Sequence, residues 1–226
     1  MERTVVVTGG TGGLGAAVTK RLLGEGWRVV VPWYAEHELA RVDEHERLEL
    51  VQADLTAPDS AAAVVAVAGD SLRALVNLVG GFAQGERVHG TPVDDFERML
   101  RLNLRPTYLM CAAALPTMLA AGAGAIVCVS ARAAVQPFPG AAGYITAKAA
   151  VLAFVDVLHE EYRAEGIRAN AIMPSTIDTP ANRASQPDAD FDRWVKPEEI
   201  AMVVAHLCSD DTSVTSGGHI PVYGRA

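Results

Sequence analysis

The chain has 226 residues, of which 50% are hydrophobic, 20% are charged and 6% are aromatic. This composition is typical of a globular protein and excludes a disordered or fibrous chain. The formal net charge is −8, from 27 acidic and 19 basic residues. We therefore expect no nucleic-acid partner, because binding phosphates needs a basic face. The length favours a single domain over residues 1–226.

The three cysteines, Cys111, Cys128 and Cys208, stand far apart and form no CxxC pair. This spacing predicts neither a disulfide framework nor a zinc site, so we expect buried free thiols and no metal. The apolar run before Thr8 is too short for the core of a signal peptide. We therefore expect a soluble, cytoplasmic protein.

A nearly uncharged stretch over residues 108–129 has the length of a membrane span. Pro116 and the Ala121-Gly122-Ala123-Gly124 run interrupt it. We therefore expect a buried helix, a turn and a buried strand there, and no membrane contact.

Short β-branched runs alternate with longer stretches rich in Ala and Leu. The short runs are predicted strands over 5–7, 28–31, 48–52, 74–79, 125–129, 167–173 and 219–222. The longer stretches are predicted helices over 14–23, 94–121, 144–164 and 197–208. The helix over 94–121 would have Thr91 as its cap and Pro92 at its first position, and it can bend at Pro106 and Pro116.

Most of these strands are apolar throughout, which indicates burial on both faces. Repeated strand–helix–strand units then predict an α/β fold, a doubly wound parallel sheet of seven strands with helices on both faces. Two looser regions, 82–90 and 175–196, follow strand ends, where the ligand crevice of such sheets lies. We expect them to be substrate loops, the second one acting as a lid.

A glycine-rich loop joins the first strand to the first helix. Its sequence is Thr8-Gly9-Gly10-Thr11-Gly12-Gly13-Leu14-Gly15. Glycines permit a tight turn and let backbone N–H groups approach a pyrophosphate, which the helix N-terminus also attracts. The loop therefore predicts dinucleotide binding, the alternative being a purely structural turn.

Further polar groups fit an adenosine. Asp54, followed by Leu55 after the third strand, can accept a hydrogen bond from the adenine amino group, unless it is an ordinary turn residue. Asn77 stands near the end of the fourth strand, and Gly80 and Gly81 would let a nucleotide lie against the backbone, unless both are structural.

The end of the second strand normally selects between NAD and NADP. An acid there binds the ribose hydroxyls, and an Arg accepts a 2′-phosphate. Trp33 stands at this place and can stack on the adenine. His37 and Arg41 can reach a phosphate and Glu36 a hydroxyl, so the choice of cofactor stays open.

Tyr144 and Lys148 stand four residues apart at the start of a predicted helix, on one face and about 6 Å apart along its axis. Ser130 ends the preceding strand on the same side of the sheet. A free Tyr has a pKa of about 10, which the Lys148 ammonium and an oxidised nicotinamide ring would lower. Tyr144 would then exchange a proton with a substrate oxygen, while Ser130 stabilises charge on that oxygen. Lys148 can also bind the nicotinamide ribose.

With these residues in view, nearly the whole chain resembles the short-chain dehydrogenase/reductase family. The family motif TGxxxGxG is matched by Thr8, Gly9, Gly13 and Gly15, and Asn77-Leu78-Val79-Gly80 loosely matches NxAG. The family's catalytic tetrad resembles Asn103, Ser130, Tyr144 and Lys148.

The resemblance implies a Rossmann fold that binds NAD(P)(H). It also implies that Asn103 holds a water of a proton relay, although an Asn satisfied by backbone is the alternative. After the sixth strand, Pro174 matches the family's Pro-Gly turn with Ser175 in place of Gly, and Ile177 and Thr179 would contact the nicotinamide carboxamide.

Two loops are similar to those of dihydropteridine reductases, one over 80–83 and one over 178–194. That branch is expected to carry an acid where this chain has Trp33, so the likeness concerns shape rather than substrate.

The preferred hypothesis is an NAD(P)(H)-dependent oxidoreductase that moves a hydride between nicotinamide and a small carbonyl or alcohol substrate. The alternatives are a dihydropteridine-reductase-like enzyme, a non-catalytic nucleotide-sensing protein, and a sugar-nucleotide epimerase or dehydratase. The last needs an added substrate domain for which the chain lacks length.

The substrate pocket is predicted to be lined by Phe82, Phe138, Phe191 and Trp194, which suits an apolar or aromatic body. The predicted helical segments 108–120 and 147–158 are apolar on nearly every side, so we expect a homodimer or homotetramer.

Overall fold

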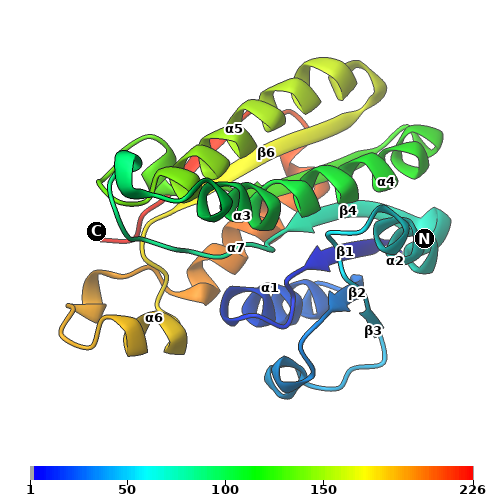
Figure 1. Ribbon diagram of the computed structural model, residues 1–226. Coiled ribbons are helices and arrows are strands. Elements are labelled where there is room, and N and C mark those ends of the chain that lie inside the picture. The colour runs from blue at the N-terminus through cyan, green and yellow to red at the C-terminus, as the bar shows by residue number, and fades with distance from the viewer. Residues whose placement is uncertain (1–2, 226) are drawn as a thin grey trace.

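A computed structural model describes residues 3–225. Its centre is a seven-stranded sheet with the order β3-β2-β1-β4-β5-β6-β7 (Figure 1). Every neighbouring pair is parallel, which confirms the predicted doubly wound fold. The strands are β1 (Thr4–Thr8), β2 (Arg28–Trp33), β3 (Leu48–Gln52), β4 (Leu72–Asn77), β5 (Gly124–Val129), β6 (Ile167–Pro174) and β7 (His219–Val222).

Helices cover both faces of the sheet. In Figure 1, α4 and α5 lie above it with α3 beside them, and α1 and α7 lie below. The helices are α1 (Gly13–Gly24), α2 (Pro58–Ala68), α3 (Val93–Asn103), α4 (Arg105–Ala121), α5 (Ala142–Tyr162), α6 (Pro180–Ser185) and α7 (Pro197–Cys208).

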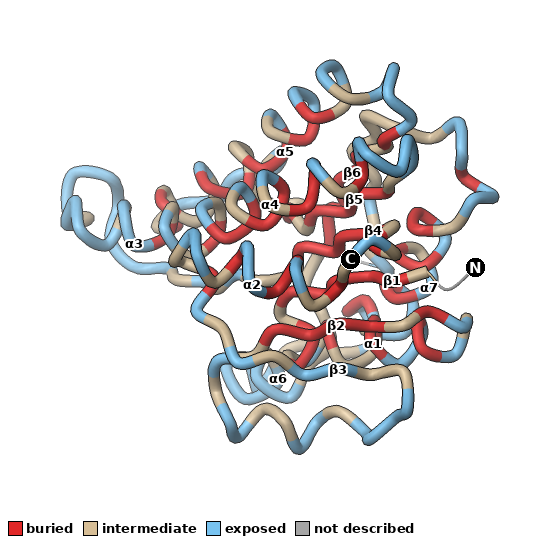
Figure 2. The backbone as a smooth tube through the Cα atoms, turned by 90° about the vertical axis from the view of Figure 1, so that its right-hand side faces the viewer, coloured by how far each residue is buried: buried red, intermediate tan, exposed pale blue. Residues whose placement is uncertain are grey.

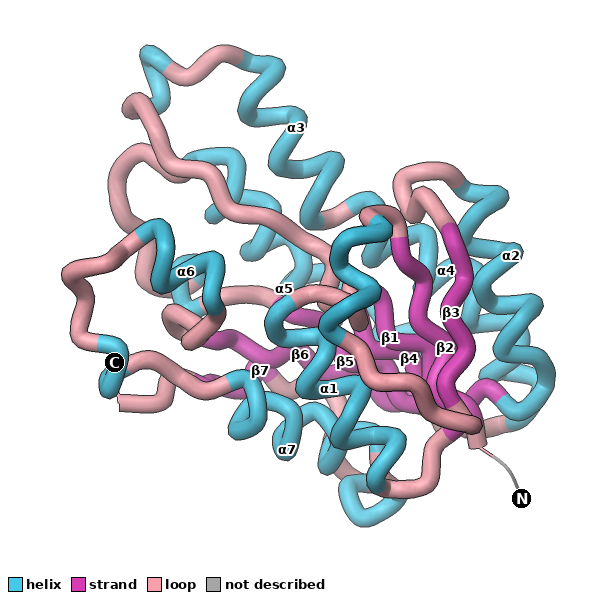
Figure 3. The backbone as a smooth tube through the Cα atoms, turned by 90° about the horizontal axis from the view of Figure 1, so that it is seen from below, coloured by secondary structure: helices cyan, strands magenta, loops and turns pink. Residues whose placement is uncertain are grey.

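The core forms two layers because side chains alternate along each strand. In β1, Val5 and Val7 pack with α1 and α7, while Val6 packs with α2, α4 and α5. All three are fully buried, and buried chain runs through the sheet and the inner faces of its helices (Figure 2). At the sheet edge, seen from below in Figure 3, β3 is half exposed and Leu50 is 41% exposed.

Two helix predictions need correction. The helix expected over 94–121 is two helices that meet at Leu104, because Pro106 has no N–H to continue the α3 ladder. The residue before α3 is Pro92, and the Thr91 hydroxyl donates instead to the carbonyl oxygens of Glu86 and Arg87. The helix α2 was not predicted, although Pro58 at its start is a typical first-turn residue.

Residues 108–129 form the helix, turn and strand that we expected, with Gly122 in the left-handed conformation that ends α4. By length and composition alone, the segment Ala142–Glu165 is apolar enough to cross a membrane. In the structure its α5 part packs on α3 and β6, as a core helix does.

Candidate active site

The glycine loop is held tightly between β1 and α1. Gly9 has a φ of +68°, and a Cβ at Gly15 would collide with the Gly9 carbonyl oxygen, so both positions require glycine. The Thr8 hydroxyl accepts hydrogen bonds from the N–H groups of Leu78 at 3.1 Å and Val79 at 3.5 Å. The loop is thereby joined to the carboxyl end of β4.

Helix α1 begins directly at the end of this loop. Its first intrahelical bond runs from Ala16 N–H to the Gly12 carbonyl oxygen. The N–H groups of Gly13, Leu14 and Gly15 therefore have no partner inside the helix. Within residues 3–225 no side chain caps this helix, and its first turn carries no acid. These donors can hold a pyrophosphate.

Lys148, Asn103 and Gly80 meet where β4 and β5 end. A Cβ at Gly80 would stand 2.6 Å from Asn103 Oδ1 and 3.1 Å from Lys148 Nζ. The Asn103 side chain, 1% exposed, donates to the carbonyl oxygens of Gly81 and Met99 and accepts from Gly81 N–H. Backbone contacts thus satisfy Asn103, and they fix the loop after β4 against α3.

Tyr144 and Lys148 lie on the first turns of α5, with Lys148 Nζ 5.9 Å from the Tyr144 ring centre. Lys148 is 5% exposed and donates to the Val129 carbonyl oxygen at 3.1 Å. Burial lowers the pKa of Lys148 to about 8 and raises the pKa of Tyr144 to about 12. Burial of the phenol therefore has a larger effect on the pKa of Tyr144 than the charge of the Lys148 ammonium. The pKa of Tyr144 is raised in the chain alone, whereas we expected it to be lowered.

Ser130 is buried beside these residues, but its hydroxyl is already engaged. Its Oγ donates to the Lys148 backbone carbonyl oxygen at 2.7 Å. A hydroxyl has a single proton to donate, so this arrangement does not offer Ser130 as a donor to a substrate oxygen. This bond and the bond from Lys148 Nζ to the Val129 carbonyl oxygen join the end of β5 to α5.

Two aromatic side chains form a wall beside Tyr144. The Phe82 ring meets the Tyr144 ring edge-on at 5.1 Å between centres and lies 6.3 Å from the Phe138 ring. Phe82 is 59% exposed and Phe138 39% exposed, so both have free surface. Gly85 N–H donates to the Gly140 carbonyl oxygen at 2.8 Å, which joins loop 82–90 to the segment before α5.

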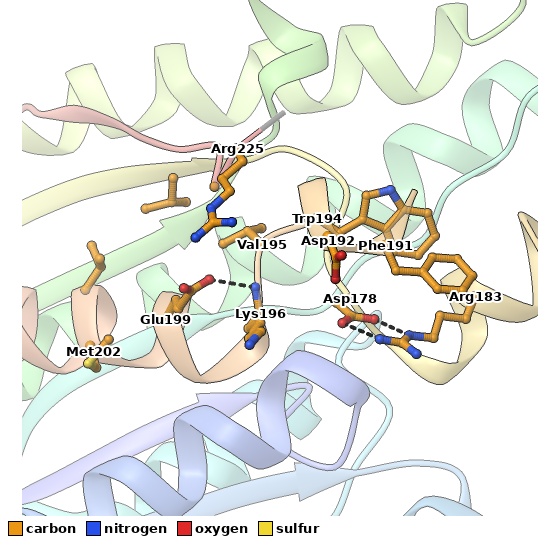
Figure 4. A pocket seen from close by; sticks show the side chains of 13 residues that line it. Asp178, Arg183, Phe191, Asp192, Trp194, Val195, Lys196, Glu199, Met202 and Arg225 are labelled. Atoms are coloured by element: carbon orange, nitrogen blue, oxygen red, sulfur yellow. Dashed lines mark hydrogen bonds and ion pairs between the residues drawn. The ribbon is translucent and has the colours of Figure 1, made fainter. Parts of the chain in front are cut away.

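The other two predicted pocket aromatics belong to region 175–196. The rings of Phe191 and Trp194 pack 4.8 Å apart, and they line a separate cavity of about 810 Å³ (Figure 4). An ion pair between Arg183 and Asp178 borders the same cavity. Within the described residues, its lining includes neither Tyr144 nor the glycine loop.

The residues after β6 return toward the glycine loop. A Cβ at Gly13 would stand 3.0 Å from Thr179 Cγ2, and the Thr179 hydroxyl accepts from Asn182 N–H at the start of α6. Ile177 pairs with Val195, closing the base of region 175–196. Pro174 is the last residue of β6. Of the predicted nicotinamide contacts, Thr179 thus lies against the glycine loop.

The predicted adenosine residues are placed differently from one another. Asp54 is exposed, and its Oδ1 accepts from the Thr56 N–H and hydroxyl in a local turn. Trp33 is partly exposed, whereas the Leu55 side chain is buried in the core. The Asn77 side chain is also buried, 3.4 Å from Cys111 Sγ and 3.7 Å from Cys128 Sγ, so it faces the core.

The family model for short chain dehydrogenases matches residues 3–190. The chain belongs to the short-chain dehydrogenase/reductase family. Members of this family use a nicotinamide dinucleotide, and membership leaves the choice between NAD and NADP open. The predicted family and fold are thus confirmed.

Similar proteins match along nearly the whole chain. A 2-(R)-hydroxypropyl-CoM dehydrogenase of Xanthobacter autotrophicus is 33% identical, covering 99% of this chain and 98% of that protein. A cis-4-hydroxycyclohexanecarboxylate dehydrogenase of Sinomonas cyclohexanicum is 34% identical, covering 99% and 96%. A solved short chain dehydrogenase/reductase family protein has a TM-score of 0.90 and 33% identity, covering 98% and 96%.

Proposed function

We propose that this oxidoreductase moves a hydride between NAD(P)(H) and a small carbonyl or alcohol substrate, with Tyr144 as general acid and base. The observation that carries the proposal is the placement of Lys148 beside Gly80, with its Nζ 5.9 Å from the Tyr144 ring centre, at the carboxyl ends of the strands where the glycine loop also lies. A phenol and an ammonium at a dinucleotide cleft are the groups that carbonyl reduction needs.

The residues present fit the cofactor. The free N–H groups of Gly13, Leu14 and Gly15 would hold the pyrophosphate, and Lys148 would bind the nicotinamide ribose. Gly80 lets Asn103 and Lys148 approach the backbone after β4, because a Cβ there would stand 2.6 Å from Asn103 Oδ1 and 3.1 Å from Lys148 Nζ. We place Pro174, Ile177 and Thr179 at the nicotinamide end on family resemblance, which the contact between Thr179 and Gly13 supports.

The proton chemistry follows from the buried pair. When bound, the cofactor supplies or accepts the hydride at the substrate carbon. In reduction, Tyr144 gives its phenolic proton to the substrate oxygen as that oxygen gains charge. Lys148, whose pKa burial lowers to about 8, can then pass a proton to the phenolate near neutral pH. Asn103 holds the neighbouring backbone in place, and we assign it the family's relay role as part of this proposal.

We propose a substrate with an apolar or aromatic body. The exposed faces of Phe82 and Phe138 beside Tyr144 support this choice. A dihydropteridine-like substrate is the second candidate, favoured by the ring wall and by the engagement of the Ser130 hydroxyl. A flat heterocycle would stack on these rings, and reduction of a C=N bond creates no alkoxide that Ser130 would need to stabilise.

We further propose that the partner is a second copy of the chain. The outer face of α4 and α5 carries an apolar groove of about 500 Å³, in which the rings of Tyr108 and Phe154 lie 5.8 Å apart. Tyr108 is 55% exposed and Val157 47% exposed, which supports burial of this face in a symmetric dimer or tetramer. Analytical ultracentrifugation at micromolar concentration tests this, and a purely monomeric profile refutes it.

The decisive test replaces Tyr144 by Phe. We expect turnover to fall by about 10²–10⁴-fold, because the proton donor is lost while the ring remains. NAD⁺ or NADP⁺ binding, measured by titration calorimetry, should persist. Tyr162→Phe at the far end of α5 is the matched control and should keep full activity.

The substrate panel for this test contains apolar ketones, quinones and dihydropteridines with both reduced cofactors. Wild-type turnover that Tyr144→Phe retains would refute the role of Tyr144. Dinucleotide binding without turnover across the panel would instead favour a nucleotide-sensing protein.

A further inference from the structure

The turn that follows β2 folds back onto the glycine loop. This turn, η1, covers Glu36–Arg41. The buried hydroxyl of Thr11 donates to Glu38 Oε2 at 3.0 Å, and Arg41 Nη1 lies 2.9 Å from Glu38 Oε1. Arg41 Nη1 also donates to the Thr11 carbonyl oxygen at 3.4 Å. The Glu38 carboxylate is thus fixed against the loop that would hold the pyrophosphate.

This place lies on the path of the adenosine ribose. In doubly wound sheets, a dinucleotide held at the first helix sends its ribose toward the end of the second strand, where an acid about 20 residues beyond the glycines meets the hydroxyls. Trp33 occupies the end of β2 in this chain and has no carboxylate. Glu38, in the turn that follows β2, places a carboxylate against the glycine loop instead.

The local charges favour a ribose without a phosphate. Arg41, a cation that bonds to the glycine loop, already has Glu38 as its partner. Glu36 and Asp54 are exposed acids that follow the carboxyl ends of β2 and β3. A 2′-phosphate would add a charge of about −2 beside them. Free ribose hydroxyls, by contrast, can donate hydrogen bonds to a carboxylate.

We propose that Glu38, held by Thr11, is a specificity-determining residue that makes the protein select NAD(H) over NADP(H). The inference rests on the proposed function, since it assumes that a dinucleotide occupies the cleft. Glu38 is 31% exposed on its side chain, so it remains open to a ligand while its position is fixed.

The test is equilibrium binding of NAD⁺ and NADP⁺ by titration calorimetry, without any substrate. We expect the wild type to bind NAD⁺ about tenfold or more tightly than NADP⁺. Glu38→Gln keeps the shape and removes the charge, so it should tighten NADP⁺ binding and reduce the ratio about tenfold. Added salt should also reduce the wild-type ratio, because salt screens exposed charges.

Two control variants separate this role from general damage. Arg41→Gln removes the neighbouring cation and should weaken NADP⁺ binding further, about threefold or more. Glu97→Gln on the exposed part of α3 should leave both affinities unchanged. Melting curves establish that each variant is folded.

NADP⁺ binding as tight as NAD⁺ binding in the wild type would overturn the inference and leave the proposed function standing. The same conclusion would follow if Glu38→Gln left the ratio of the NAD⁺ and NADP⁺ affinities unchanged. Failure of the folded wild type to bind either dinucleotide would overturn the proposed function together with this inference.

Discussion

The two ends of the candidate cleft are built differently. At the catalytic end, Asn103, Ser130 and Lys148 are at most 5% exposed and bond to backbone atoms. At the adenosine end, the side chains of Glu38 and Arg41 are 31% and 46% exposed, and they bond to each other and to Thr11. The end that we propose for proton transfer is thus fixed by the core, whereas the end that we propose for cofactor choice is a partly exposed ion pair held to the glycine loop through Thr11.

Gly80→Ala tests the rigidity of the catalytic end and has the largest expected effect. The added Cβ would meet Asn103 Oδ1 at 2.6 Å and Lys148 Nζ at 3.1 Å. We expect a loss of about 1–3 kcal/mol in the free energy of unfolding, because backbone bonds hold both neighbours. Turnover should fall at least about tenfold, since Lys148 is displaced.

Urea titrations at pH 7 measure that loss, and Gly85→Ala is the control, because a Cβ at Gly85 meets no described atom within 4 Å. Wild-type stability and turnover in Gly80→Ala would show that this end of the cleft is adaptable.

The pH dependence of stability tests the burial of Lys148. Its pKa is lowered to about 8, from 10.5 in the unfolded chain, so the unfolded state binds more protons between these values. Stability should therefore rise by about 2–3 kcal/mol between pH 8 and 10.5. The raised pKa of Tyr144, about 12, acts oppositely, and its contribution is lost as pH rises from 10 through 12.

Unfolding free energies of wild type and Lys148→Met at pH 7.5, 9 and 10 isolate the lysine, because the remaining groups cancel in the difference. We expect the rise only in the wild type. Equal slopes in both proteins would show that Lys148 keeps its ordinary pKa in the folded state.

Ser130→Ala distinguishes two roles of Ser130, which are joining β5 to α5 and contacting the substrate. Loss of the bond to the Lys148 carbonyl oxygen should cost about 1–2 kcal/mol of stability. If Ser130 only positions α5, KM should stay near the wild-type value and kcat should fall modestly. Ser130→Thr should then restore kcat and stability. A fall in kcat of about 10²-fold or more without loss of stability would instead make Ser130 the donor to the substrate oxygen.

The smallest effect is expected at the adenosine end. Glu38→Gln removes a half-exposed ion pair, and such pairs contribute about 0–1 kcal/mol to stability. We expect chemical denaturation to show a change below about 0.5 kcal/mol. A larger loss would mean that the turn after β2 is as integral to the fold as the catalytic end.

Sequence periodicity was sufficient to predict the parallel sheet, since strands such as β1 are continuous apolar runs that indicate burial on both faces. Residue spacing was sufficient to predict that Tyr144 and Lys148 lie close together, which depends only on helix geometry. It did not reveal the partners of Ser130 and Asn103, because a hydroxyl or amide can bond to any nearby backbone group.

A bend at Pro106 was predicted, but the full break at Leu104 was not, because the apolar pattern continues across it. The contact between Glu38 and Thr11 was missed as well. It joins residues 27 positions apart through a turn whose path the sequence does not specify.

The bond between Gly85 and Gly140 makes two distant stretches one unit. Gly140 has a φ of +84°, and a Cβ there would stand 2.5 Å from the Gly85 carbonyl oxygen, so neither stretch can shift alone. Under the proposed function, a redesign of substrate choice has to exchange residues 82–90 and 136–140 together. Variants in which only one of the two stretches is changed would mostly lose the backbone contact between Gly85 and Gly140.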